Sequence, residues 1–190
     1  MPLILASASP RRLDLLARLG VVPQAVDPAD IDEIPEAQER PRDHAARLAR
    51  EKALAVAVRH PDRAVLAADT IVAVGRRILP KAEHEAVARQ CLSLLSGRRH
   101  HVLTAVAVVD PTGRLRERLS DTIVTFKHLT VAEIDAYLAA GEWSGKAGGY
   151  AIQGRAEAFV RFLSGSHSGV VGLPLYETRG LLLASGISLG

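Results

Sequence analysis

The chain has 190 residues, which is the length of one globular domain rather than two independent ones. Hydrophobic residues make up 48% and charged residues 24%, a composition that excludes an intrinsically disordered protein. A chain of this length buries roughly 70% of its unfolded surface, so folding requires neither a disulfide nor a metal. The formal net charge of +3 permits a polyanionic partner without requiring one. Of the 24 basic residues only four are lysines, namely Lys52, Lys81, Lys127 and Lys146.

The single cysteine, Cys91, excludes a disulfide framework and a Cys-rich zinc site. It favours a reducing, cytoplasmic location. Because no apolar run reaches the ~18–20 residues that span a bilayer, we expect no membrane association. The apolar start, Met1–Ser7, is too short for a signal peptide and has no positively charged region before it. We interpret it as a buried first strand.

Apolar patterns and the positions of Pro and Gly predict the secondary structure. In chain order we expect a strand over 3–6, a helix from Pro10 to Gly20, an acidic Pro-rich loop over 27–39, a helix from Pro41 to near His60, a strand over 64–74, a helix over 82–95, strands over 102–109 and 123–126, a helix from Val131 to Gly141, a Gly-rich loop over 141–154, a strand over 159–163 and a helix over 174–184. Helical periodicity assigns to the core Leu13, Leu15, Leu16, Leu19, Leu48, Ala49, Leu54, Val131, Ile134 and Leu138.

Two local signals support this assignment. Residues 64–74 form an almost continuous apolar run with β-branched residues, typical of a strand buried on both faces. Thr130 and Glu133 have the spacing of a capping box at the start of a helix. Because βα steps are mixed with at least one hairpin, the pattern predicts a single α/β domain over 1–190 with a mixed twisted sheet flanked by helices.

The first candidate site is the segment Ser7–Arg12, SASPRR. A strand that ends in small hydroxyl residues and leads into a helix directs backbone N–H groups and the positive end of the helix dipole at a ligand. Arg11 and Arg12 in the first turn add bidentate donors for phosphate. The alternative is an ordinary N-cap at Ser9 with solvated arginines. No Walker A motif is present in the chain.

The second candidate is Asp69, the only charge within the apolar strand 64–74. An unpaired carboxylate is costly inside an apolar strand, so this position favours catalysis or metal binding over a structural role. Among the acidic residues of the 27–39 loop, Glu33 is a candidate ligand for a divalent cation. The alternative for that loop is a solvated acidic surface.

The third candidate combines the lysines with the run Lys146–Gly154, KAGGYAIQG. Lysine supplies a compact, reorientable charge that suits a phosphate group. The glycines allow close approach of the backbone, and Gln153 offers the donor and acceptor needed to read a nucleobase edge. Tyr150 is interpreted as a core residue rather than a stacking platform. Chance placement is the alternative for the lysines.

Two further patterns are interpreted without a catalytic role. Residues 165–169, GSHSG, fail the nucleophile-elbow pattern because His167 replaces the central Ser, and they predict a hairpin turn. The run 98–101, RRHH, lacks the spacing of metal ligands. It is interpreted as a solvated or phosphate-adjacent basic patch.

Taken together, these segments resemble the Maf-like nucleoside triphosphate pyrophosphatases over nearly the whole chain. The motifs that carry the resemblance, in order, are LASASPRR (5–12), DIDE (30–33), RLAREKA (47–53), AADTIV (67–72), Lys81, LSGRRHHVLTAV (95–106), KAGGYAIQG (146–154) and VVGLPL (170–175). The resemblance implies an inosine-triphosphatase-like fold with two lobes around a central cleft. It also allows a homodimer.

Within this family the chain is similar to the dTTP/UTP pyrophosphatase branch, which pairs SPRR with ADT and YxIQG. Arg11, Thr70 and Gln153 stand at the positions that set base preference in the family. The 7-methyl-GTP branch differs at all three places. The chain departs from the family around Lys81, where the usual Gly-Lys-Pro is Pro-Lys-Ala and a rigid turn is lost.

The resemblance implies hydrolysis of the bond between the α- and β-phosphates of a nucleoside triphosphate. Ser7, Arg12, Lys52 and Lys81 would bind the phosphates. Asp69 would act as the general base, as a ligand for Mg²⁺ or Mn²⁺ together with Glu33, or as both.

Three other functions remain open at this point. One is pyrophosphatase activity on 7-methyl-GTP or on a broad set of modified nucleotides, and the others are nucleic-acid binding and non-catalytic control of cell division. Only seven residues are aromatic and no long basic run occurs, so a stable nucleic-acid complex is not expected.

Overall fold

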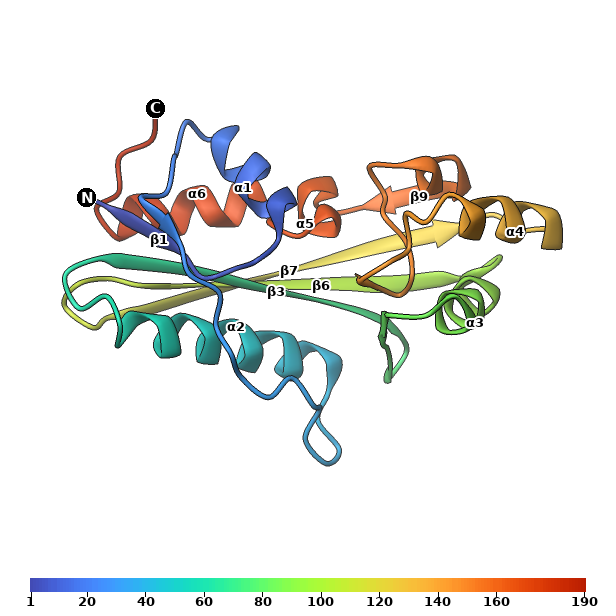
Figure 1. Cartoon of the computed structure of the whole chain (residues 1–190), viewed down its shortest axis with the longest axis horizontal. Helices are drawn as coiled ribbons and strands as arrows, with labels where there is room; N and C mark the ends of the chain where they lie inside the picture. Colours follow the sequence, from blue (N-terminus) through green and yellow to red (C-terminus); the bar gives the residue numbers. More distant parts are fainter.

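The computed structural model describes all residues, 1–190 (Figure 1). The strands are β1 Leu3–Leu5, β2 Ala25–Val26, β3 Ala64–Val74, β4 Arg77–Leu79, β5 Lys81–Ala82, β6 Arg99–Val109, β7 Leu115–Phe126, β8 Lys146–Ala147 and β9 Val160–Ser164. The helices are α1 Pro10–Ala17, α2 Pro41–Ala57, α3 Glu85–Leu95, α4 Val131–Ala139, α5 His167–Val171 and α6 Leu175–Ala184, with a 3-10 turn at Arg155–Phe159.

One seven-stranded mixed sheet organises the molecule. Its order is β2-β1-β3-β6-β7-β9, and β4 pairs with the far end of β3. β1 is parallel to β2 and β3, whereas the β3, β6, β7 and β9 neighbours are antiparallel. A separate two-stranded sheet joins β5 to β8. The predicted α/β fold with a mixed sheet and flanking helices is confirmed.

Helices cover both faces of the sheet. Figure 1 shows α2 along one face and α1, α5 and α6 along the other, while α3 and α4 lie toward the opposite end of the long strands. The side chains of β3 alternate accordingly: Val65 and Ala67 join the core under α2, and Leu66 and Ala68 join the core under α1 and α6. A third core cluster lies among α3, α4 and the ends of the long strands.

The edge of β3 is interrupted at its centre. β1 pairs with β3 over residues 64–66, and β4 pairs with it over 72–74. Between them, residues 67–71 have β6 as their strand partner on one side only. Because successive side chains of a strand point to opposite faces, Asp69 and Thr70 reach the same gap from the two faces of the sheet. This interruption is what positions the site described below.

Several predicted boundaries and positions are wrong. α3 begins at Glu85 rather than residue 82, because Lys81 and Ala82 pair with β8 instead. β7 begins at Leu115 rather than 123, because its first half, which includes the consecutive charged residues 116–118, pairs along β6 as the second half does. The predicted hairpin turn at 165–169 instead leads into helix α5, capped by Ser166. The helix positions predicted to be buried but found exposed are Leu13, Leu54 and Val131.

The basic run before β6 also differs from the prediction. His100 is fully buried rather than solvated, because β6 starts at Arg99 and carries His100 into the core. Its Nε2 lies 2.9 Å from the Tyr150 hydroxyl, and its ring packs edge-on against Phe126 and Tyr150. Burial lowers the pKa of His100 to about 4. The predicted core role of Tyr150 is confirmed.

Two smaller predictions are also confirmed. Thr130 and Glu133 form the complete capping box at the start of α4. Cys91 is a free, buried thiol in α3. No helix combines the length and the apolar character needed to cross a membrane.

Candidate active site

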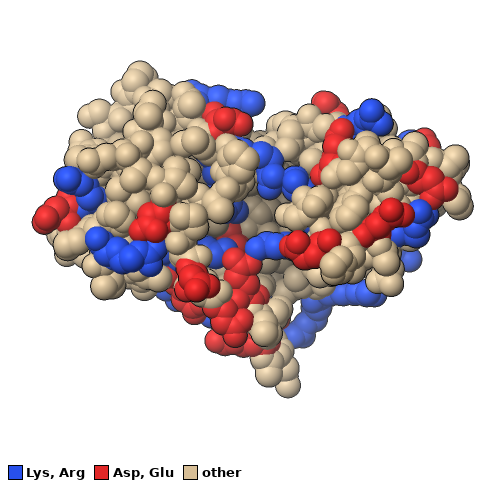
Figure 2. All heavy atoms as spheres, viewed as in Figure 1, with Lys and Arg blue, Asp and Glu red and all other residues tan.

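A cleft of about 510 Å³ opens at the interrupted edge of β3. Figure 2 shows a hollow between the two ends of the molecule, with basic side chains on its walls and acidic side chains below it. The cleft is lined by all nine residues predicted from the sequence, namely Ser7, Arg11, Arg12, Glu33, Lys52, Asp69, Thr70, Lys81 and Gln153. These residues come from α1, α2, β3, β5 and three loops, so the fold brings together positions that are far apart in the chain.

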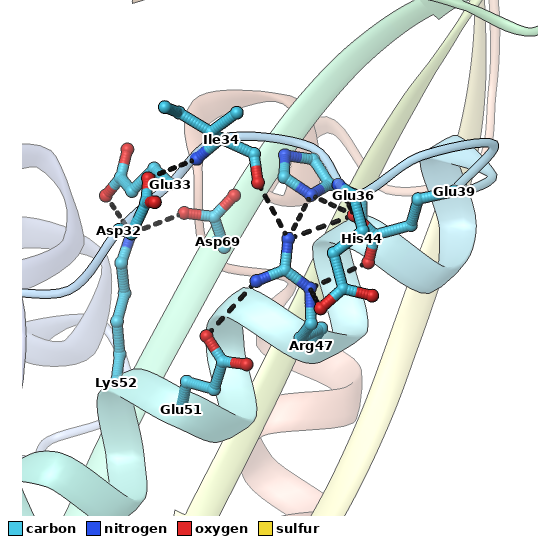
Figure 3. Close-up of polar contacts among 10 residues, drawn as sticks. All are labelled: Asp32, Glu33, Ile34, Glu36, Glu39, His44, Arg47, Glu51, Lys52 and Asp69. Carbon is cyan, nitrogen blue, oxygen red and sulfur yellow. Dashed lines mark hydrogen bonds and ion pairs between the residues drawn. The ribbon is translucent and has the colours of Figure 1, made fainter.

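Lys52 lies at the centre of the charged groups. It projects from α2, and its Nζ lies 2.6 Å from Asp69 Oδ1 and 2.5 Å from Glu33 Oε1 (Figure 3). Asp69 is 3% exposed and Lys52 is 8% exposed, so their ion pair is largely shielded from water. Lys81 pairs with the other oxygen of Glu33 from the opposite wall. Two carboxylates and two ammonium groups therefore alternate across the floor of the cleft.

Glu33 is ionised in this arrangement. Its partial burial by itself raises its pKa, but the hydrogen bonds from Lys52 and Lys81 outweigh that effect and hold the pKa at about 2. At neutral pH Glu33 is therefore a carboxylate facing the cleft. A negatively charged oxygen ligand is available there for a cation.

The acidic loop that carries Glu33 is held by a second side chain of α2. Arg47 donates from Nε and Nη2 to the carboxylate of Glu39 at 2.8 and 2.9 Å, and from Nη2 to the backbone oxygen of Ile34 at 3.1 Å. His44 Nδ1 lies 2.8 Å from Glu39 Oε2, the oxygen that also accepts from Arg47 Nη2 (Figure 3). Because Ile34 follows Glu33 directly, this network determines where Glu33 lies. The sequence analysis did not identify Arg47 as a site residue.

Arg12 connects the start of α1 to β3 and to the residue that follows α5. Its Nε donates to the backbone oxygen of Gly172 at 2.8 Å, its Nη1 to Ser7 Oγ at 3.0 Å and its Nη2 to Thr70 Oγ1 at 3.4 Å. Burial lowers the pKa of Arg12, and nearby Asp69 acts in the opposite direction. An arginine retains its charge under these conditions, so Arg12 supplies a fixed cation beside the hydroxyls of Ser7 and Thr70.

The opposite wall comes from the Gly-rich loop and the small β5–β8 sheet. Lys81 pairs with Ala147, and Ala82 pairs with Lys146. This pairing holds the Lys81 backbone in the absence of the family's usual proline, and it brings Lys146 to the cleft. Gln153 is exposed at the rim, with its amide available to a ligand.

The end of helix α5, which begins within the segment 165–169 predicted to be a hairpin turn, forms part of the wall. Val170, Val171 and Gly172 line the cleft. Ser166 accepts a hydrogen bond from the backbone N–H of Gly169 and caps the helix. Ser166 is one of the residue types preferred at N-caps, and this is the local signal for the start of the helix.

The arrangement is suited to a polyanion. Five basic and three acidic side chains line the cleft, and the basic ones are Arg11, Arg12, Lys52, Lys81 and Lys146. An excess of cations in a narrow hollow raises the local concentration of anionic ligands. The structure contains no cluster of three or more His, Cys, Asp or Glu side chains placed to hold a metal ion.

Comparison with known proteins gives a consistent picture. The family described as "Maf-like protein" matches residues 2–185. A dTTP/UTP pyrophosphatase of Novosphingobium aromaticivorans is 67% identical over 187 residues, covering 98% of this chain and 93% of the relative. A dTTP/UTP pyrophosphatase of Rhodospirillum rubrum is 64% identical over 189 residues, covering 100% of this chain and 90% of the relative.

The fold has a counterpart among solved structures. A HAM1 protein from Coxiella burnetii aligns over 97% of this chain and 99% of its own, with a TM-score of 0.51 and 16% identity. At that identity the likeness concerns the fold alone. The family match and the identities to the curated relatives, by contrast, extend across almost the entire sequence. The chain belongs to the Maf-like protein family.

Proposed function

We propose that this protein is a nucleoside triphosphate pyrophosphatase that hydrolyses dTTP and UTP to the monophosphate and pyrophosphate. The observation that carries the proposal is the convergence of Lys52, Glu33 and Asp69 on one cleft that also contains Arg12 and Lys81. The names and the high identities of the two curated relatives support this substrate class.

The phosphates bind to the cationic part of the cleft. Arg12 and Lys81 lie on opposite walls and Lys52 lies between them, so one triphosphate chain contacts all three. The anionic oxygens of the phosphates repel a nucleophile, and neutralising that charge is a main requirement for hydrolysis. Ser7 assists by keeping the Arg12 guanidinium in place.

Asp69 is proposed as the general base. Lys52 binds its Oδ1, which leaves the second carboxylate oxygen to accept a proton from water. The water oxygen forms a bond to the α-phosphorus, and the bond between that phosphorus and the oxygen bridging to the β-phosphate breaks. Pyrophosphate departs with the bonding electrons, and the monophosphate keeps the oxygen from water.

The donor set fits a hard divalent cation such as Mg²⁺ or Mn²⁺. Glu33 and Asp69 already converge on one cation, the Lys52 ammonium, with short contacts. Mg²⁺ is commonly held by one or two carboxylates together with substrate phosphates rather than by a cage of protein ligands. When bound, the ion supplies neutralisation of phosphate charge and lowers the pKa of a coordinated water.

The pyrimidine is read by a second set of residues that line the same cleft. Arg11, Thr70 and Gln153 are proposed to contact the base, and all three line the cleft. Arg11 offers only donors, whereas the Gln153 amide offers both a donor and an acceptor. This combination suits a ring that carries carbonyl groups and a ring N–H.

The proposal is tested by a panel of nucleoside triphosphates assayed with Mg²⁺ or Mn²⁺. The panel comprises dTTP, UTP, CTP, the purine nucleotides and 7-methyl-GTP, and both pyrophosphate and monophosphate are quantified. We expect dTTP and UTP to give the highest kcat/KM, with equal amounts of the two products. A preference for 7-methyl-GTP would place the protein in the other branch, and the absence of pyrophosphate release from every nucleotide would refute the proposal.

A further inference from the structure

A second hollow lies near the end of β3, on the face of the sheet that α2 covers. It has a volume of about 380 Å³, which is within the range of small-ligand sites. Its buried base is formed by Ala73 of β3 and Leu103 of β6. Ala73 is four residues along β3 from Asp69, so the two are about 13 Å apart. No residue that lines this hollow also lines the cleft.

Three exposed arginines line this hollow, which we call the arginine pocket, namely Arg40, Arg42 and Arg76. They come from two separate segments. Arg40 and Arg42 flank Pro41 at the start of α2, whereas Arg76 lies in the turn between β3 and β4. None of the three forms an ion pair. Their one side-chain hydrogen bond is long, 3.5 Å from Arg76 Nη2 to the backbone oxygen of Gln38.

A single acidic side chain, Asp121, lines the pocket, and it already has a partner. Its Oδ1 lies 2.7 Å from His101 Nδ1. The three guanidinium groups therefore leave the pocket with an excess of positive charge. Cations gathered in one hollow repel one another and attract an anion that neutralises them.

The chemistry of the lining residues indicates which anion fits. A guanidinium group binds phosphate oxygens through two parallel N–H donors. Because the arginines lie on two segments, one ligand that contacts both needs more than one anionic group. No Phe, Tyr or Trp lines the pocket, so it lacks the aromatic surface on which a nucleobase stacks.

We propose that the arginine pocket is a second anion site, separate from the cleft, that binds two or more consecutive phosphoryl groups and bridges the start of α2 to the β3–β4 turn. This inference does not depend on the proposed function. Free pyrophosphate and the phosphate chain of a nucleoside triphosphate share the required chemistry. The test therefore includes both ligands.

The test follows the backbone amides of the full chain by two-dimensional ¹H–¹⁵N NMR without added metal. Sodium pyrophosphate is titrated in one series, and a UTP analogue with a methylene bridge between the α- and β-phosphates in another. We expect saturable shifts of the amides of Gly75 and Leu103, which report on the pocket separately from Gly145 and Gly172 of the cleft. Shifts with only one of the two ligands would identify the source of the phosphates.

Sodium sulfate at the same ionic strength is the control for general charge attraction. Sulfate carries a single anionic group and cannot bridge the two segments, so we expect it to bind at least about tenfold more weakly. Equal affinities for sulfate and pyrophosphate would overturn the inference. So would the absence of saturable shifts at Gly75 and Leu103 with both phosphate ligands.

The double variant Arg42→Gln with Arg76→Gln tests the assignment to these side chains. We expect the Kd measured at Gly75 and Leu103 to rise at least about tenfold, while the Kd measured at the cleft amides stays the same. Arg18→Gln with Arg179→Gln is the matched control, since both arginines are exposed and line neither hollow. If the double variant does not fold, Arg76→Gln alone serves the same purpose. An unchanged Kd in the folded variant would overturn the inference.

Discussion

Asp69 shows at the scale of one residue how position determines chemistry. It sits in an apolar strand and is almost fully buried, yet it is directed to a gap in the strand pairing and meets Lys52 there. Its apolar neighbours and single charge were enough to make it a candidate site residue from the sequence alone. The partnership with Lys52 and Glu33 was not predictable, because it depends on how α2 and the acidic loop pack against β3.

The Asp69→Asn variant should remain folded and lose activity. An amide preserves the shape of the side chain but removes the proton acceptor, so we expect kcat on dTTP to fall by at least about 10²-fold. Circular dichroism and thermal melting check the fold, and Asp121→Asn serves as a matched control because Asp121 is exposed and pairs with His101 away from the cleft. Turnover near that of the wild type in Asp69→Asn would exclude the general-base role.

Gln153→Glu should alter base preference without altering stability. Gln153 is exposed at the rim, and surface substitutions usually change stability by less than about 0.5 kcal/mol. Glutamate loses the amide donor, so kcat/KM for UTP and dTTP should fall about tenfold relative to the other nucleotides of the panel. An unchanged ranking of substrates would contradict the base-reading role.

His100 makes stability depend on pH in a particular window. Burial lowers its pKa from 6.5 to about 4, so between these values the unfolded chain binds a proton that the folded protein does not. The contribution of His100 to the free energy of unfolding is therefore fully present above pH 6.5. It declines as pH falls toward 4, by about 3 kcal/mol at most. Carboxylates with lowered pKa values, such as Glu33, add a further loss only as pH falls below about 4.5.

Chemical unfolding at pH 7 and pH 5 measures this dependence. His100→Gln, which does not titrate, should reduce the difference in unfolding free energy between the two pH values. His84→Gln is the matched control, since His84 is exposed. An equal pH dependence in the wild type and in His100→Gln would show that His100 does not cause it.

At the scale of elements, helix α2 has two functions in the site. Its residue Lys52 contacts the carboxylates directly, and one and a half turns earlier Arg47 holds the loop that carries Glu33. The sequence predicted this helix because Pro41 marks its start. It did not predict which of the many arginines would reach back to the loop, since that depends on the loop's path and not on helical periodicity.

Arg47→Lys should weaken metal activation. Lysine lacks the planar fork that contacts Glu39 and Ile34 together, so Glu33 loses its fixed position. If the proposed metal is held by Glu33, we expect the concentration of Mn²⁺ needed for half-maximal activity to rise about tenfold, the lower end of the range for removing a group that orients a metal ligand. Arg50→Lys is the control: Arg50 lies on the same helix and makes a similar forked contact with Glu117, away from the cleft. A similar rise in both variants would contradict the positioning role of Arg47.

The elements that were not predicted from the sequence form because tertiary contacts outweigh the local sequence pattern. β5 and β8 are two residues long and exist only because their segments meet on the same wall of the cleft. β7 extends through a run of charged residues because the whole of β6 is available to pair with it. The long apolar strand β3, by contrast, was predicted with both boundaries correct because its burial on both faces leaves a continuous apolar signal.

For the whole molecule, the site consists of residues from both ends of the chain and from both faces of one sheet. The net charge of +3 does not reveal the site, because it is a sum over the whole chain. Five basic side chains are concentrated in the cleft. The organisation as a single domain with two lobes stays a prediction from length and resemblance. The mixed sheet, the flanking helices and the interrupted edge of β3 explain why residues that are far apart in the chain reach one cleft.

In the proposed reaction, water attacks the α-phosphorus of a pyrimidine nucleoside triphosphate in this cleft. Hydrolysis of UTP in ¹⁸O-labelled water, with mass analysis of the products, tests it most directly. We expect UMP that carries one ¹⁸O atom together with unlabelled pyrophosphate. Formation of UDP and phosphate, or ¹⁸O in the pyrophosphate, would contradict it.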